Sequence, residues 1–173
     1  MVSNYRLFIQ KESFAKRLLK DVVTPRGSVK KHVGSLCRTR AKLDRKKLGI
    51  ADVPKIKDID ILIVVPSDDD LGKVSLRRPH RVISKGVRRM SVVIDRHSID
   101  IFIAVKHELP FALLHYTSPA QYNIRLRAYA KKMGYRLNQY GLFRGTHVLN
   151  HKFKSQSAIQ KFLGVTLRDL TQR

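Results

Sequence analysis

The stretch Asp58-Ile59-Asp60-Ile61-Leu62-Ile63-Val64-Val65 decides the fold of this chain. Aliphatic and β-branched residues fill it, which is typical of a buried strand. Side chains alternate along a strand, so the two aspartates that open it project from one face. A second apolar run, Ser98-Ile99-Asp100-Ile101-Phe102-Ile103-Ala104, carries one more aspartate. We expect this run to be a strand beside the first, which would bring Asp100 to the other two carboxylates.

Three neighbouring carboxylates need a compensating charge. A carboxylate within an apolar strand is costly unless a cation or hydrogen bonds compensate it. Hard divalent cations such as Mg²⁺ take oxygen ligands and are the common solution. The pattern therefore predicts a metal site at Asp58, Asp60 and Asp100. The alternative is that these are strand-end residues facing water.

The composition indicates a polyanionic partner. Among 173 residues, 36 are Lys or Arg and 13 are Asp or Glu, which gives a formal net charge of +23. Nucleic acid is the first candidate partner and a membrane surface is the second. No apolar stretch approaches the roughly 18 residues of a membrane span, and no secretory signal opens the chain, so we expect no membrane partner. The single cysteine, Cys37, excludes an intramolecular disulfide and fits an intracellular, reducing compartment.

Two other groups contain metal-ligand residue types. Ser67-Asp68-Asp69-Asp70 is interpreted as a solvated loop, because consecutive side chains on an ordered strand cannot all face one ion. His147 and His151 are four residues apart, but a zinc site would need further ligands. Neither group carries the prediction of a metal site.

Hydrophobic periodicity divides the first part of the chain into strands and helices. We expect a short strand over residues 5–9, followed by a helix up to Val22. The segment 29–33 leads into Gly34-Ser35, residues 36–49 continue as a helix, and Pro54 breaks the chain before the strand at 58–65. Further strands are expected at about residues 90–95 and 98–104.

From about residue 106 the periodicity becomes helical. Ser118-Pro119 predicts a helix start, with Ser as the cap and Pro in the first turn, and Gly134 predicts the helix end. Residues 135–143 are expected to form a small strand pair, and residues 155–163 a last short helix. The predicted fold class is therefore α+β: a mixed β-sheet with flanking helices over residues 1–105, followed by a smaller α+β lobe over residues 106–173.

Gly34-Ser35 lies between an expected strand and an expected helix. Glycine allows a phosphate to approach the backbone, and the amides of a helix N-terminus bind phosphate oxygens. Arg38, one turn later, offers a guanidinium fork matched to phosphate. Alone, Gly-Ser is also a common turn. The order of strand, Gly-Ser, helix and Asp-x-Asp strand would place a triphosphate cradle and a metal site on one sheet.

This order resembles the nucleotidyltransferases of the polymerase beta type. Residues in the second half narrow the resemblance to the family X DNA polymerases. They are His115-Tyr116-Thr117-Ser118-Pro119, Asn123, Arg127 and Tyr135-Arg136-Leu137-Asn138-Gln139-Tyr140-Gly141-Leu142-Phe143. Residues 159–165 also resemble the family's terminal helix. The similarity covers about residues 29–38 and 56–165.

The resemblance implies a palm domain at residues 1–105, which holds the catalytic site, and a C-terminal nucleotide- and base-pair-binding lobe at residues 106–173. In that palm, Asp58 and Asp60 bind two Mg²⁺ ions, with Mn²⁺ as the other metal to consider. Asp100 completes the site and helps to activate the primer 3′-hydroxyl. Gly34, Ser35 and Arg38 are implied to hold the β and γ phosphates.

The resemblance also implies contacts to the nucleotide and to DNA. His115 and Tyr116 would lie beneath the incoming sugar. Asn123 and Arg127 would face the minor-groove edge of the nascent base pair. Residues 86–90 loosely resemble a family segment that contacts the DNA backbone, which makes Arg88 and Arg89 candidates for DNA binding.

Four departures from the family pattern stand out. Ser118 occupies a position where the family usually has Gly, and Cys37 replaces a common Arg. The segment 39–57 is longer than usual and basic, so it is either a loop or helix that touches DNA or a solvated insertion. The chain has no room for the family's N-terminal lyase domain, and no helix-hairpin-helix signature is found, so lyase activity is not expected.

The function implied by the resemblance is template-directed DNA polymerisation that fills short gaps in DNA repair, including base excision repair. Its partners would be gapped or primed DNA, a dNTP and a DNA ligase, with the protein acting as a monomer. The resemblance is also compatible with a viral source, which would place the protein in the host cytoplasm or the virion. The alternatives are a template-independent or RNA-type nucleotidyltransferase, and a non-catalytic basic nucleic-acid-binding protein.

Overall fold

The chain forms two compact units, Met1–Val105 and Lys106–Arg173. The structure is a computed structural model that describes residues 3–45 and 47–165. Lys46 of the basic segment and residues 166–173 of the expected C-terminal lobe lie outside the described residues. Both units combine helices with strands, so the α+β prediction is confirmed.

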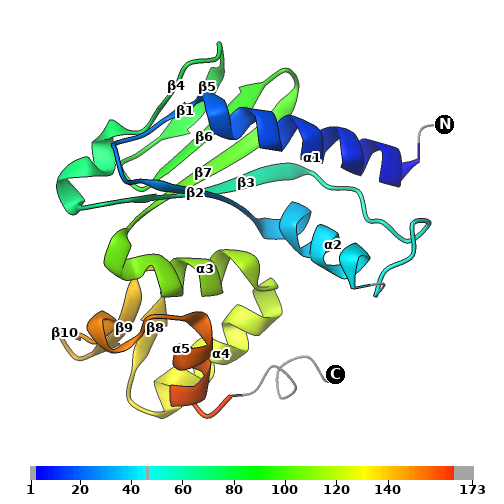
Figure 1. Cartoon of the computed structure of the whole chain (residues 1–173). Helices are drawn as coiled ribbons and strands as arrows, with labels where there is room; N and C mark the ends of the chain where they lie inside the picture. The colour runs from blue at the N-terminus through cyan, green and yellow to red at the C-terminus, as the bar shows by residue number, and fades with distance from the viewer. Residues whose placement is uncertain (1–2, 46, 166–173) are drawn as a thin grey trace. The chain divides into compact units, whose positions relative to one another are not determined.

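The first unit is built on a five-stranded mixed sheet (Figure 1). Its strands, in spatial order, are β2 (Val29–Val33), β3 (Asp58–Val65), β7 (His97–Val105), β6 (Arg89–Ile94) and β5 (Arg81–Lys85). β3 and β7 pair in parallel, and the remaining neighbours are antiparallel. The predicted strands at 58–65, 90–95 and 98–104 are confirmed, with small shifts at the ends of the last two. The edge strand β5 was not predicted, because all five of its residues are exposed and show no alternation.

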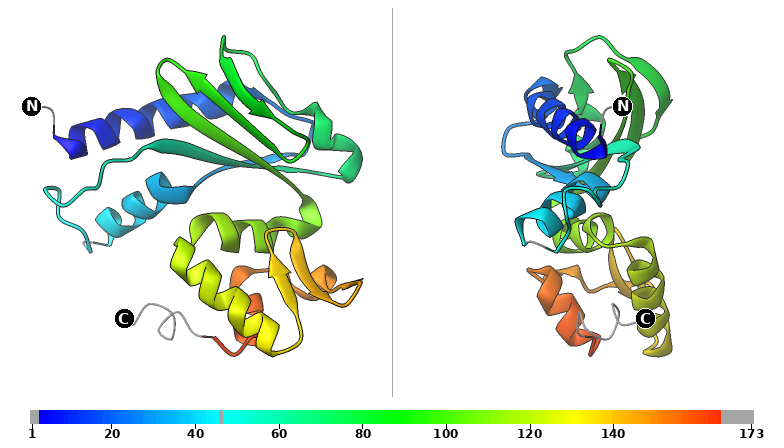
Figure 2. Two further views of the ribbon diagram at one scale, coloured as in Figure 1. Left: turned by 180° about the vertical axis from the view of Figure 1, so that it is seen from behind. Right: turned by 90° about the vertical axis from the view of Figure 1, so that its right-hand side faces the viewer.

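One long helix, α1 (Asn4–Asp21), covers one face of this sheet (Figure 2). The predicted strand over residues 5–9 is wrong, because these residues begin α1. The Ser3 hydroxyl caps the helix by accepting the Arg6 backbone N–H at 3.3 Å. Phe8, Ala15 and Leu18 lie on one helical stripe and are buried, so burial of this stripe against the sheet outweighs the strand propensity of the first residues.

The strands place their apolar and acidic side chains on opposite faces. Ile59, Ile61 and Ile63 belong to the core that contains the buried residues of α1. Asp58 and Asp60 alternate with them and therefore project from the other face. The same alternation in β7 separates the core residue Ile101 from Asp100. The face of the sheet that α1 leaves uncovered is thus the face that carries the carboxylates.

The second helix, α2 (Gly34–Asp44), follows β2 directly. It begins two residues before, and ends five residues before, the helix predicted over residues 36–49. The Arg40 side chain ties it to α1 by donating from Nε to Glu12 Oε1 at 2.8 Å and by lying 5.1 Å from the centroid of the Phe8 ring. This hydrogen bond from Arg40 lowers the pKa of Glu12. Within the basic segment, Arg40 is therefore a structural residue.

Shorter elements complete the first unit. β1 (Val22–Val23) pairs with β4 (Ser75–Leu76) in a two-stranded sheet. The acidic segment predicted to be a loop forms a 3-10 helix, η1 (Asp68–Lys73). In η1, Asp70 accepts hydrogen bonds from Ser67 and Lys73, each at 2.9 Å. These local contacts order a segment that has almost no apolar residues.

The second unit contains two helices, a small sheet and a final helix. Its elements are η2 (Lys106–Glu108), α3 (Leu109–Thr117), α4 (Ala120–Lys132), β8 (Arg136–Asn138), β9 (Gly141–Arg144), β10 (His147–Val148), η3 (Asn150–Lys152) and α5 (Gln156–Phe162). The three strands form an antiparallel sheet in the order β10–β9–β8. The predicted strand pair and last helix are confirmed.

The helix start predicted at Ser118-Pro119 is displaced by one residue. Ser118 follows the end of α3, and Pro119 occupies the N-cap position of α4, where it provides no side-chain cap. The predicted stop at Gly134 is confirmed, since Gly134 has φ +78° in the left-handed region that favours glycine.

Helix length and hydropathy bear on the membrane alternative. α1 is 18 residues long, but it alternates apolar and charged stripes as expected of a helix lying on a sheet. In residues 3–45 and 47–165, no helix is both long enough and apolar enough to cross a bilayer.

Candidate active site

Asp60 and Asp100 face each other across the parallel pair of strands. They are register partners in the β3–β7 ladder, and Asp58 lies two residues earlier on the same face. The sequence interpretation required the two strands to be neighbours, and they are. The backbone thus brings three predicted site residues to one part of the sheet.

Asp60 is the most perturbed carboxyl group of this face. Burial raises its pKa to about 6, and the charges of Asp100 and Asp58 add to this increase. The positive charge of Arg38 and a hydrogen bond from the Ser35 backbone N–H act in the opposite direction. The pKa of Asp60 therefore depends on both of the other acidic residues and on the first turn of α2, so these groups lie close together.

Gly34 lies in contact with the Asp60 side chain. Its φ is +69°, and a Cβ built at this position would lie 2.6 Å from Asp60 Cγ. Such a separation is well inside van der Waals contact. Gly34 is therefore required twice, once for the turn from β2 into α2 and once for the approach of the carboxylate to the backbone.

The first turn of α2 offers donors for an anion. Val33 occupies the N-cap position and makes no side-chain cap hydrogen bond. The N-terminal amides of an α-helix lack intrahelical partners and carry a partial positive charge. Ser35 and Arg38, the other predicted phosphate-binding residues, lie in the first turns of the same helix. The structure thus places all three predicted phosphate-binding residues beside Asp60.

Both carboxylate oxygens of Asp100 have hydrogen-bond donors. The Arg89 guanidinium donates to Oδ2 at 3.0 Å, and the Ser91 hydroxyl donates to Oδ1. Arg89 also lies over the Phe102 ring, 5.4 Å from its centroid. Arg89, which was predicted to contact DNA, is therefore an ion-pair partner of a predicted catalytic residue.

The three carboxylates do not converge on one point. Across residues 3–45 and 47–165, no three His, Cys, Asp or Glu side chains gather closely enough to hold a metal ion. The side chain of Asp60 points to the first turn of α2, whereas that of Asp100 points to Arg89 and Ser91. Their oxygen donors nevertheless suit a hard cation, and the mutual repulsion that raises the pKa of Asp60 is the repulsion a cation would relieve.

The acidic segment at residues 68–70 and the two histidines are the other candidate metal ligands. Asp70 is engaged by Lys73, and Asp68 accepts from Arg88 at 3.4 Å. Neither the acidic segment nor His147 and His151 forms a group of three ligands within the described part of the chain. The alternatives of a metal at residues 68–70 and of zinc at the histidines therefore receive no support.

Lys11 of α1 fixes the chain just before β3. Its Nζ donates to the Ile56 carbonyl at 2.8 Å and to the Lys57 carbonyl at 2.7 Å. Burial lowers its pKa, and the nearby Asp58 acts in the opposite direction. Sequence reasoning missed this lysine, because its partners are backbone carbonyls 45 and 46 residues away.

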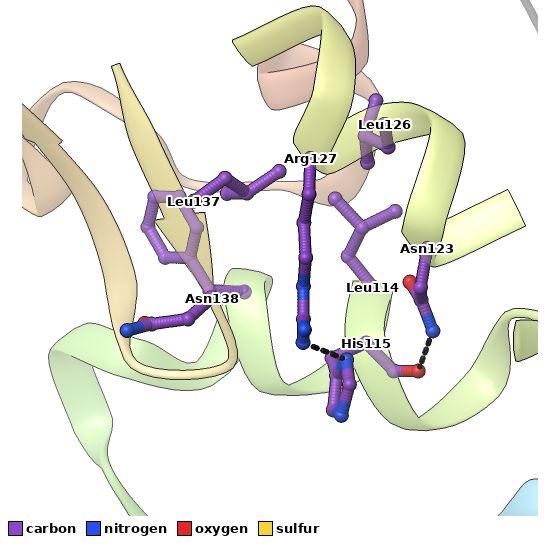
Figure 3. Close-up of a pocket in the computed structure, with 8 residues that line it drawn as sticks. Leu114, His115, Asn123, Leu126, Arg127, Leu137 and Asn138 are labelled. Atoms are coloured by element: carbon purple, nitrogen blue, oxygen red, sulfur yellow. Dashed lines mark hydrogen bonds between the residues drawn. The ribbon is translucent and has the colours of Figure 1, made fainter. Parts of the chain in front are cut away.

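In the second unit, His115, Asn123 and Arg127 form one polar group (Figure 3). His115 lies in the last turn of α3, and the other two residues lie one turn apart on α4. Asn123 Nδ2 donates to the His115 carbonyl at 2.7 Å, and Arg127 lies 3.1 Å from His115 Nδ1. Tyr116 is beside them, with its ring centroid 4.8 Å from that of His115. All four predicted nucleotide-binding residues of this unit are thus brought together.

The contact with Arg127 identifies the tautomer of His115. A guanidinium can only donate, so His115 Nδ1 must accept, and the ring proton of the neutral imidazole lies on Nε2. Burial lowers the pKa of His115, and the charge of Arg127 lowers it further. The imidazole is therefore neutral near pH 7 and presents an N–H donor.

The hollow beside this group is small. It has a volume of about 10 Å³ and is lined by Phe111, Leu114, His115, Asn123, Leu126, Arg127, Leu137 and Asn138. That is about the space of one water molecule. The hollow is therefore too small to hold a nucleotide.

The sequence did not predict the two hydrogen-bond donors to Asp100. Ser91 was not singled out, and Arg89 was assigned to DNA. Both lie on β6, two residues apart, and so share the face of Asp100, with Ser91 as its register partner. A hairpin turn between residues 94 and 97 combined with the period of two would have been the signal for both.

Comparison with known proteins gives similarity along most of the chain. Residues 112–173 match a family model described as DNA polymerase beta thumb. The repair DNA polymerase X of African swine fever virus is 36% identical over 122 residues, which span 65% of this chain and 70% of that protein. The DNA polymerase/3′-5′ exonuclease PolX of Bacillus subtilis is 28% identical over 92 residues, which span 50% of this chain and 16% of that protein.

The fold has a counterpart among solved structures. A crystal structure of Leishmania infantum polymerase beta, described as a ternary P/T complex, superposes with a TM-score of 0.60. The superposition covers 94% of this chain and 73% of the other at 16% sequence identity. At that identity the likeness establishes a shared fold, while the likeness in function rests on the sequence relatives.

Proposed function

Because this chain belongs to the family X DNA polymerases, we propose that it is a template-directed gap-filling enzyme that adds a dNTP to a primer 3′-hydroxyl with the aid of two Mg²⁺ ions. One observation carries the proposal: Asp60 and Asp100 are register partners on adjacent parallel strands, with Asp58 on the same face. A basic protein that only coats nucleic acid would have no use for three carboxylates in this position.

Asp58, Asp60 and Asp100 would hold the metal ions. When bound, two divalent ions supply charge neutralisation at the attacking and leaving oxygens of phosphoryl transfer. The donors are hard oxygens, as Mg²⁺ and Mn²⁺ require.

The first turn of α2 would hold the triphosphate. Its backbone amides and the Ser35 hydroxyl are donors to phosphate oxygens, and Arg38 adds a guanidinium fork. Gly34 leaves room for this approach, since it presents no side chain. These residues would orient the nucleotide, and orientation accounts for much of the catalysis of phosphoryl transfer.

Asp100 would orient the primer 3′-hydroxyl and help to withdraw its proton. As the primer oxygen forms its bond to the α-phosphorus, the bond from that phosphorus to the departing pyrophosphate breaks and the hydroxyl proton must leave, and a carboxylate within hydrogen-bond reach favours that proton transfer. The Ser91 hydroxyl, which donates to Asp100, would help to hold this carboxylate in position.

The polar group of the second unit would contact the nucleotide. His115 and Tyr116 present rings suited to packing under the sugar, and His115 keeps a donor at Nε2. Asn123 and Arg127 are held on one face of α4 by their contacts with His115. From there they would donate to the minor-groove acceptors, which all Watson–Crick pairs present in similar positions.

The basic residues would bind gapped or primed DNA. The net charge of +23 provides an attraction to the phosphate backbone that does not depend on sequence. Arg89 is the first residue of β6 and Arg88 directly precedes it. Both are candidates for such contacts. A DNA ligase would be the next enzyme to act on a filled gap, because filling leaves a nick.

The test is incorporation of each of four dNTPs opposite a known template base. A one-nucleotide-gapped duplex with Mg²⁺ would be offered to the wild type, to Asp100→Ala and to Asp69→Ala, an exposed aspartate of η1 that serves as the control. We expect template-following incorporation that drops by about a thousand-fold in Asp100→Ala, as loss of one group in a preorganised site commonly costs 10²–10³, and persists in Asp69→Ala.

Other outcomes would identify the alternatives. Incorporation that ignores the template base would indicate a template-independent nucleotidyltransferase. DNA binding without incorporation by a folded wild type would indicate a non-catalytic binding protein. A folded Asp100→Ala variant with wild-type rates would refute the assignment of this site.

A further inference from the structure

The ion pair between Arg89 and Asp100 occupies oxygen atoms that a metal ion would need. Arg89 donates to Oδ2 at 3.0 Å, and Ser91 donates to Oδ1, so neither carboxylate oxygen is without a donor. The Asp100 side chain is 22% exposed and that of Arg89 is 58% exposed. Asp100 is thus held in place, whereas Arg89 can leave into solvent.

Arg89 also contacts a neighbouring residue on the sheet. Arg89 is the register partner of Phe102 and lies over the ring of that residue, while Ser91 is the register partner of Asp100. An aromatic face and a carboxylate together suit a guanidinium better than an ammonium, because only the guanidinium is planar and can lie over the ring while it donates. The site is therefore built for arginine at this position.

We propose that Arg89 is an internal counter-ion that competes with divalent metal for the Asp100 carboxylate. The inference rests on the proposed function, since it takes Asp100 to be a metal ligand. A divalent ion bound at Oδ2 would be repelled by the Arg89 guanidinium, which lies 3.0 Å from the same oxygen, so metal binding there would weaken or displace the Arg89 contact. The displaced guanidinium would then be available to a DNA phosphate.

The competition lowers the intrinsic metal affinity of the protein. Whatever free energy the Arg89–Asp100 pair contributes must be given up when the metal binds, and a ligand's apparent affinity falls by the population that cannot bind it. Arg89 is largely exposed, so the effect is modest: removal of Arg89 is expected to tighten metal binding by about two- to five-fold.

The experiment measures Mn²⁺ binding to the full chain without DNA or nucleotide, by the loss of the free-ion electron paramagnetic resonance signal. The variants are Arg89→Gln, Arg89→Lys and, as control, Arg81→Gln, which removes one positive charge from an exposed position on the neighbouring strand β5. A salt concentration of about 0.15 M, where the Debye length is about 8 Å, limits the effect of distant charge. Circular dichroism would establish that each variant is folded.

We expect Arg89→Gln to bind Mn²⁺ about two- to five-fold more tightly than the wild type, with Arg81→Gln unchanged. Arg89→Lys should lie between the wild type and Arg89→Gln, since it restores the charge but not the planar fork. In an Asp100→Asn background, Arg89→Gln should have no effect, because the contested carboxylate is gone. This loss of coupling would separate competition at Asp100 from a general change of charge.

Equal affinity in the wild type and Arg89→Gln, or weaker binding in Arg89→Gln, would overturn the proposal while leaving the metal site intact. An equal tightening in Arg81→Gln would also overturn it, since the cause would then be net charge. If the wild type and Arg89→Gln both fail to bind Mn²⁺ at millimolar concentrations, the metal site of the proposed function fails as well. The two failures are thus distinguishable.

Discussion

Gly34 presents its bare α-carbon to the carboxyl group of Asp60, and a Cβ there would lie 2.6 Å from Asp60 Cγ. The contact joins the start of α2 to the acidic end of β3. It explains why Asp60 is partly buried and why its carboxylate accepts the Ser35 backbone N–H. The turn proposed to bind phosphate and the strand proposed to bind metal are therefore packed directly against each other.

Gly34→Ala should therefore cost more than an ordinary loss of a glycine with positive φ. The matched control is Gly134→Ala, where φ is +78° but no atom lies within 4 Å of the added Cβ. In the control, only the strain of a positive φ lowers the unfolding free energy, by about 1 kcal/mol, and the polymerase rate should be unchanged. Gly34→Ala should lose more stability than the control, as measured by urea denaturation. Its rate of single-nucleotide incorporation should fall by at least about tenfold. Equal losses in the two variants would contradict the contact.

Asp60 should make the folding stability depend on pH. Its pKa is raised in the folded state, to about 6, so the folded protein holds its proton more tightly than the unfolded chain does. The stabilisation is complete below the unfolded pKa of about 4 and is lost as the pH rises through about 6. Asp60→Asn has no carboxyl group to titrate at this position, so its stability should not fall in this way as the pH rises. In EDTA, the stability of the variant relative to the wild type should thus grow by on the order of 1–2 kcal/mol between pH 4 and pH 7, after allowance for solvent screening.

Urea denaturation at several pH values measures this difference. Asp69→Asn, at an exposed position, is the control and should leave the pH dependence of the wild type unchanged. A stability difference between Asp60→Asn and the wild type that shrinks as the pH rises would reverse the assigned sign and show that Asp60 is stabilised in its ionised form.

Lys11→Met should loosen the start of β3. The variant keeps the apolar stem but leaves the Ile56 and Lys57 carbonyls without their charged donor, and such hydrogen bonds contribute about 1.5–3 kcal/mol when well formed. For this partly exposed lysine we expect a loss of about 1–2 kcal/mol in urea denaturation, with faster hydrogen exchange at the first amides of β3. Lys20→Met, an exposed position on the same helix, should change stability by less than about 0.5 kcal/mol. The same small change in Lys11→Met would show that the two contacts contribute nothing.

Arg127→Gln should raise the pKa of His115. Burial is the larger cause of the lowered pKa and remains in the variant, so the pKa should rise without reaching that of an exposed histidine. Nitrogen-15 NMR of the imidazole can follow the titration and should also find the neutral wild-type ring protonated on Nε2. Lys131→Gln, an exposed position near the end of α4, removes the same charge as a control and should leave the titration unchanged. A neutral ring protonated on Nδ1 would contradict the hydrogen bond with Arg127.

The sequence was sufficient for the elements that combine a clear period with chemistry. Asp58 and Asp60 sit in a run whose alternation and burial agree, so the strand and its acidic face follow from local rules. The Gly34 turn was likewise predictable, because glycine, serine and a following helical pattern reinforce each other. The grouping of His115, Asn123 and Arg127 came from resemblance to a family and not from periodicity.

What the sequence left out depends on distant partners. The first residues of α1 have strand propensity, but the Ser3 cap and the burial of the stripe that begins at Phe8 favour the helix. Strand β5 has no buried side chain, so no pattern marked it. Arg40 looks like an ordinary surface charge, yet it pairs with Glu12 of α1, and no spacing along the chain encodes that pairing.

The parallel pairing of β3 with β7 also determines when the acidic cluster comes into being during synthesis. β2 is made before β3 and can pair with it at once, but β7 leaves the ribosome only after β5 and β6. At about 5–20 residues per second, the roughly 40 residues between Asp60 and Asp100 take about two to eight seconds to translate. A nascent chain released before β7 emerges would carry Asp58 and Asp60 on a sheet without Asp100, and under the proposed mechanism it would acquire no polymerase activity however long it was left to fold.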